Sequence, residues 1–145
     1  MASARGVRSG RLETSLLKLA YLVYLVAVGV LVFQPTGGQA SGSVLWVSHL
    51  LHSWHTPVWL WRPVSVEWGL NVLMFVPLSL LGSFFRPGWT WRDWAGVGFV
   101  ASGLIELVQL VLLPDRVASF GDVVANTLGA LLGALLAPYA LRLLR

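Results

Sequence analysis

The sequence predicts an all-α integral membrane protein with four transmembrane helices. Of its 145 residues, 57% are hydrophobic and only 11% are charged, and the mean hydropathy is +0.75. A membrane-spanning helix needs roughly 17–25 mostly apolar residues. Strands of a membrane barrel are disfavoured, because the apolar runs are rich in Leu and Ala and do not alternate with polar residues. We therefore treat residues 1–145 as a single transmembrane domain, with spans expected at about 16–33, 69–85, 94–113 and 123–144.

The positive charge is placed as in a membrane protein and does not indicate nucleic-acid binding, although the formal charge is +4 and the pI is near 10.4. Only Arg62 and Arg116 lie in the first and third loops. The other basic residues precede the first span, separate the second from the third, or close the chain: Arg5, Arg8, Arg11, Lys18, Arg86, Arg92, Arg142 and Arg145. The positive-inside rule therefore places both termini in the cytoplasm.

The first apolar run follows a basic stretch, as in a secretory signal, but it is longer than a usual signal core, so we interpret it as a retained helix. A Gly-, Pro- and Ser-rich loop follows at 34–43. Residues 44–56 then predict an amphipathic helix lying flat in the outer membrane interface, ended by Pro57. Its apolar half carries Trp46, Val47, Leu50, Leu51 and Trp54, and its polar half carries Ser48, His49, His52, Ser53, His55 and Thr56.

The three histidines of this segment do not predict a metal site. On a helix, His49, His52 and His55 spread over about 120° of the polar face, which suits display to water better than joint ligation of one ion. The chain has no cysteine, which excludes disulfides and thiolate metal sites. We expect no cofactor, and the role of the histidines stays open.

The second and fourth spans carry packing signals. Pro77 is expected to bend the second span, because it removes a backbone hydrogen bond. Gly129 and Gly133 have the small-xxx-small spacing that lets another helix approach closely. Asp122 and Asn126 lie on the same face as these glycines, so both are expected to point into the bundle.

Glu106 is the main candidate functional residue. A carboxylate this deep in a membrane segment costs on the order of 2.5–3.5 kcal/mol on insertion scales, so it is rarely retained without a partner or a task. Five further polar side chains are expected near its depth in the outer leaflet, from three spans and the third loop: Asn71, Gln109, Arg116, Asp122 and Asn126.

Structural interpretations of this cluster stay open beside the functional one. Ser119 and Asp122 have the spacing of a capping box at the start of the fourth span. Asn71, Gln109 and Asn126 fit interhelical hydrogen bonds worth about 0.6 kcal/mol each. Arg116 fits simple neutralisation of a nearby carboxylate.

The order and spacing of these residues resemble the VanZ-like family of small bacterial membrane proteins. The resemblance rests on Asn71-x3-Phe75-x-Pro77-Leu78, Glu106-x2-Gln109, Arg116 and Asp122-x3-Asn126-x2-Gly129-x3-Gly133. Ser79 stands where the family usually has glycine, which leaves the local packing open. The resemblance implies a multi-pass protein of the bacterial plasma membrane, and the family's name comes from resistance to the glycopeptide teicoplanin.

The leading functional hypothesis is a binding or modifying site for a lipid-linked envelope intermediate or a lipid-tailed glycopeptide. Arg116 would bind a phosphate or carboxylate, the amides would bind sugar or peptide groups, and Glu106 would act as a general base if the reaction is catalytic. No recognised catalytic motif accompanies it, so enzymatic activity stays open. The alternatives are a proton-coupled transporter working as a homodimer and a non-catalytic assembly partner of an envelope enzyme.

Overall fold

The computed structural model describes residues 2–33, 41–113 and 119–143. Every regular element in these ranges is a helix, namely α1 (Ala2–Val32), α2 (Gly42–Ser53), α3 (Val58–Trp61), α4 (Pro63–Phe85), α5 (Trp91–Leu112) and α6 (Phe120–Leu143). Four helical stretches are long and apolar enough to cross a bilayer: Thr14–Val32 within α1, and the whole of α4, α5 and α6. The predicted all-α class with four membrane helices is therefore confirmed.

The chain divides into two compact units, residues 1–33 and residues 34–145. The first unit consists of α1. Most of its large apolar side chains between Leu16 and Leu31 are exposed. A helix that is apolar around its circumference suits a lipid environment.

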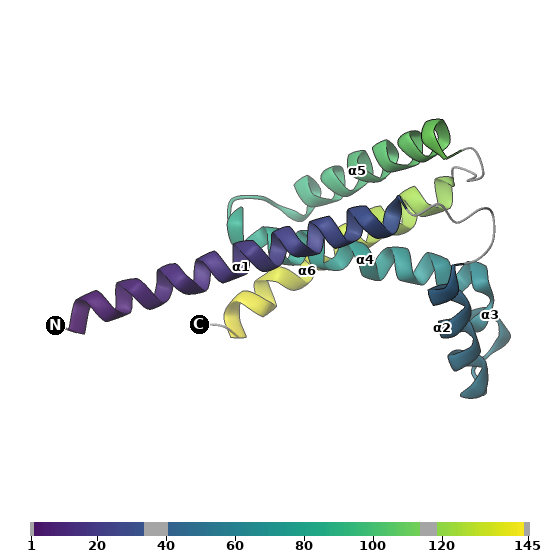
Figure 1. The fold of residues 1–145 in the computed structure, drawn as a ribbon, viewed down its shortest axis with the longest axis horizontal. Coiled ribbons are helices and arrows are strands. Elements are labelled where there is room, and N and C mark those ends of the chain that lie inside the picture. The colour runs from purple at the N-terminus through teal and green to yellow at the C-terminus, as the bar shows by residue number, and fades with distance from the viewer. Residues whose placement is uncertain (1, 34–40, 114–118, 144–145) are drawn as a thin grey trace. The chain divides into compact units, whose positions relative to one another are not determined.

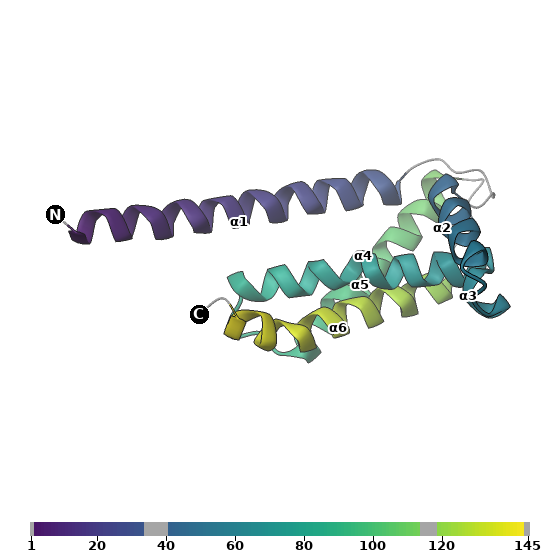
Figure 2. The same cartoon turned by 90° about the horizontal axis from the view of Figure 1, so that it is seen from below.

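In the second unit, α6 packs against both α4 and α5, and the three helices run along a common direction (Figures 1 and 2). The surface of this three-helix bundle carries many exposed large apolar side chains, including Leu73, Leu104, Leu107 and Leu132. The interior of the bundle is built largely from small and polar residues, including Ser79, Ser83, Gly98, Ser102, Glu106, Gln109, Asn126, Gly129, Ala130 and Gly133. An apolar surface around a small and polar interior is the arrangement expected of helices packed in lipid.

The contact between α4 and α6 is made by backbone packed against backbone. A Cβ added to Gly129 would lie 2.9 Å from Cβ of Phe75 and against the carbonyl oxygen of Val72, and one added to Gly133 would meet the carbonyl oxygen of Val76. This confirms the close helix approach predicted from the spacing of the two glycines. Ser79, whose packing the sequence left open, is fully buried and donates its hydroxyl to the Ala130 carbonyl at 2.6 Å.

The α4 helix begins at Pro63, six residues before the expected start of this span at Gly69. Proline suits the first helical turn, because the missing N–H has no partner there and the fixed φ angle is already helical. The helix then continues through Pro77 to Phe85. The early start matters for the site, because it places Asn71 well inside the helix.

The short helices α2 and α3 cross the end of the bundle where α4 begins (Figures 1 and 2). The α2 helix is capped by the Ser41 hydroxyl, which accepts a hydrogen bond from the Val44 N–H at 3.4 Å. The predicted polar half is wrong at Ser48, which is buried and donates to the Trp61 carbonyl. The chain reverses direction between residues 54 and 57, so the backbone of α3 covers part of the α2 face that was expected to meet water.

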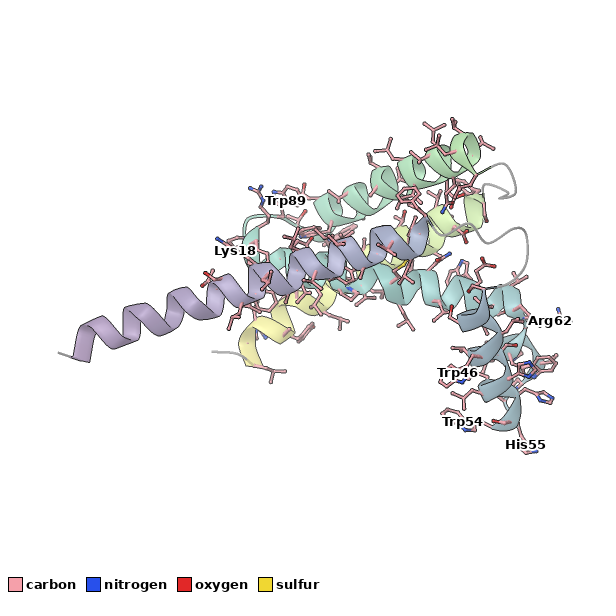
Figure 3. The ribbon with its side chains drawn as sticks, in the orientation of Figure 1. Lys18, Trp46, Trp54, His55, Arg62 and Trp89 are labelled. Atoms are coloured by element: carbon pink, nitrogen blue, oxygen red, sulfur yellow. The ribbon has the colours of Figure 1, made fainter. Side chains whose placement is uncertain are left out.

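Trp46 of α2 and Trp54, which follows the last residue of α2, remain available to a membrane interface. Trp46 and Trp54 are each 67% exposed. Both project toward the side on which α4 to α6 extend, whereas Arg62 projects to the opposite side (Figure 3). Aromatic side chains turned toward the bilayer and a cation turned away are what an interfacial helix requires. The cytoplasmic placement of the termini stays a prediction.

Candidate functional site

One face of α5 carries all of that helix's buried residues. They are three or four positions apart, so they form a single stripe along the helix: Trp94, Gly98, Ser102, Glu106 and Gln109. Fifteen residue steps separate Trp94 from Gln109, or about 22 Å at 1.5 Å per residue. No residue in the stripe is aliphatic. The half of the stripe from Ser102 to Gln109 is therefore polar, whereas Trp94 packs against Gly82 of α4 and Gly98 packs against Ala130 of α6.

Glu106 connects this stripe to the start of α6. Its side chain is 8% exposed, and its Oε2 accepts a hydrogen bond from the Ser119 N–H at 2.7 Å. Ser119 immediately precedes α6, and its carbonyl accepts from the Asp122 N–H at 3.1 Å. The carboxylate thus lies at the N-terminus of α6, where the helix dipole favours negative charge.

This bond changes the interpretation of Ser119 and Asp122. A capping box would direct the Ser119 N–H to the side chain of Asp122. In the structure that N–H is donated to Glu106, a residue of another helix. A charge-assisted hydrogen bond of this kind is worth about 1.5–3 kcal/mol, so Glu106 also has a structural role in joining α5 to α6.

Asn71 and Asp122 form a second link between helices. The Asn71 Nδ2 donates to Oδ1 of Asp122 at 2.8 Å and joins α4 to the first turn of α6. The sequence placed Asn71 near the start of its span. Because α4 begins at Pro63, Asn71 lies eight residues, or about 12 Å, inside the helix.

Asn126 forms a third link, with a residue that the sequence analysis missed. Its Nδ2 donates to the Ser102 Oγ at 2.8 Å, and the two residues are 3% and 0% exposed. The Oδ1 of Asn126 is buried and has no hydrogen-bond partner among the described residues. A signal for Ser102 was present, because it lies four residues before Glu106 and therefore on the same helix face.

These contacts involve Asn71, Glu106, Asp122 and Asn126, and Gln109 is the fifth of the six predicted site residues to lie in the same bundle. Gln109 is buried one turn beyond Glu106, toward the end of α5. Arg116 lies outside the described residues. Ser102, Glu106 and Gln109 occupy successive turns of α5 over about 10 Å, so the polar groups form a column and not a single layer.

Carboxylate, amide and hydroxyl groups of this column can exchange hydrogen bonds with sugar, peptide or phosphate-ester groups. Among the described residues, no three His, Asp or Glu side chains are grouped so that they could hold a metal ion. His52 instead packs edge-on against Trp61, with ring centroids 4.8 Å apart.

The fold and the site together define a helical membrane protein with an apolar surface and a polar column at the centre of its bundle. The family model described as VanZ/LLP1 matches residues 19–143, which is nearly the whole chain. The chain belongs to this VanZ-like family, as the spacing of its polar residues suggested. No curated protein matches it, and no solved structure matches it.

Proposed function

We propose that this protein binds the headgroup of a cell-envelope amphiphile at the end of the bundle where α5 ends and α6 begins. The amphiphile is a lipid-linked envelope intermediate or a lipid-tailed glycopeptide. The family is linked to glycopeptide resistance, and we propose that binding at this site is the contribution of this chain to such resistance. By the distribution of basic residues, this end of the bundle faces the outside.

The observation that carries the proposal is the buried carboxylate of Glu106. It lies six residues, or about 9 Å, from the end of α5, so its depth is nearer the headgroup region than the centre of the bilayer. An acyl tail in the surrounding lipid would bring its headgroup to this level. Ionisable groups at such depths are costly and usually serve a pathway or a ligand.

The neighbouring groups suit the headgroup of such an amphiphile. The Gln109 amide lies one turn nearer the end of α5 and offers both a donor and an acceptor. The Asn71 and Asp122 pair borders the same level on the side of α4. Arg116, in the adjoining loop, would supply the positive charge for a phosphate or carboxylate.

Glu106→Gln is the variant that separates ligand binding from structure. A glutamine side chain keeps an oxygen that accepts the Ser119 N–H, so the link between α5 and α6 is retained while the negative charge is lost. Asp93→Asn is the matched control, because Asp93 caps the opposite end of α5 through Thr90.

The test measures teicoplanin susceptibility in a susceptible Gram-positive host that expresses wild type, Glu106→Gln or Asp93→Asn at equal membrane levels. We expect wild type and Asp93→Asn to protect and Glu106→Gln to lose protection. Protection that survives in Glu106→Gln would refute a role for the carboxylate, and no protection by wild type would separate this chain from resistance. The mass of teicoplanin recovered from the cells then distinguishes binding, which leaves it unchanged, from modification.

A further inference from the structure

The Ser102 and Asn126 pair lies one turn deeper in the bundle than Glu106. Ser102 precedes Glu106 by four positions along α5, which corresponds to about 6 Å. The Ser102 oxygen is used as the acceptor for the Asn126 amide. This leaves the hydroxyl hydrogen of Ser102 and the Oδ1 of Asn126, and the described part of the chain provides no partner for either.

These two groups define a specific chemistry. A donor beside an acceptor is complementary to a hydroxyl, which accepts one hydrogen bond and donates another. Neither side chain of the pair is charged, so the pair does not select an ion. One turn further along α5, on the side away from Glu106, α5 and α6 are packed closely. A Cβ built on Gly98 would lie 2.5 Å from Cβ of Ala130 there. The pair is therefore suited to one small neutral group on the side of Glu106.

We propose that the ligand of this protein is a lipid with a free hydroxyl between its headgroup and its acyl chains, and that Ser102 and Asn126 bind this hydroxyl. The proposal rests on the proposed function, in which Glu106 meets the headgroup. A group about 6 Å below that level is at the depth where a headgroup joins its chains. Lipids whose linkage hydroxyls are all esterified would bind less well, because they leave the buried Asn126 carbonyl without a donor.

The probes are 1-O-hexadecyl-glycero-3-phosphocholine, which has a free hydroxyl between its headgroup and its chain, and its 2-acetyl ester, in which that hydroxyl is capped. Retention of each lipid by the purified full chain is measured by native mass spectrometry. Wild type should retain the free alcohol about five- to tenfold better than the ester, as expected for one buried pair of hydrogen bonds.

Ser102→Ala and Asn126→Leu should both bind the two lipids equally. Thr127→Val is the control and should keep the preference, because the Thr127 hydroxyl bonds to Val123 within its own helix at 2.7 Å. If Asn126→Leu does not fold, Ser102→Ala decides the result, because it removes only the hydroxyl.

Equal retention of alcohol and ester by wild type would overturn the inference and leave the pair as the site of a buried water. A preference that persists in Ser102→Ala would overturn it as well. Susceptibility to teicoplanin tests the proposed function separately. Protection that depends on Glu106, without a hydroxyl preference, refutes only the ligand class. A hydroxyl preference without such protection refutes the proposed function and leaves a lipid site.

Discussion

Replacing Gly129 or Gly133 with alanine tests whether α6 packs on the backbone of α4. In an open helix position, alanine would gain up to about 1 kcal/mol over glycine. Here the new methyl group would meet the carbonyl oxygen of Val72 or Val76, which moves only if α4 moves. Overpacking typically costs about 1–3 kcal/mol, and rigid backbone neighbours favour the upper part of that range. We expect a net loss of about 2 kcal/mol for each variant.

Gly103→Ala is the matched control, because a Cβ at Gly103 meets nothing within 4 Å. The assay is thermal unfolding in one detergent, followed by the loss of the monodisperse peak of a fluorescent fusion. A loss of 2 kcal/mol corresponds to a Tm lower by about 4–8 °C, while the control should keep or raise its Tm. If Gly129→Ala and Gly133→Ala behave like Gly103→Ala, the packing of α6 on α4 described above is wrong.

Three further predictions concern the polar link, the turn after α2 and the membrane orientation. In a double-mutant cycle on unfolding free energy, Asn71→Ala and Asp122→Ala should couple by about 0.6–1.7 kcal/mol, and additive losses would mean that the two side chains do not meet. His55 has a φ of 55°, so His55→Gly should raise the Tm and His55→Val should lower it, and the two variants should differ by about 1–2 kcal/mol in the free energy of unfolding. Equal stability of the two variants would contradict the left-handed turn. Because the chain has no cysteine, an impermeant maleimide should label His49→Cys in intact cells and Gly88→Cys only after permeabilisation, and the reverse pattern would invert the topology.

Much of the candidate site could be predicted from the sequence, because the chemistry of each side chain and the helix face on which it lies both follow from the order of residues. Glu106 and Gln109 were identified by their cost in an apolar segment, and Asn126 by its place on the glycine face of α6. Ser102 was passed over, because a lone serine in a membrane helix carries no such cost when its hydroxyl bonds locally. Its burial against Asn126 became visible only when α5 was placed against α6.

The sequence by itself determined the class of the protein, its four membrane helices and the close approach of a helix at Gly129 and Gly133. These properties depend on segment length, hydropathy and the period of a helix, which are local quantities. The tertiary structure decided the partners: the Ser119 N–H goes to Glu106 and not to Asp122, and Ser48 is buried beneath a turn of chain. A hydrogen bond between helices depends on their relative rotation and depth, and packing fixes both only after each helix has formed.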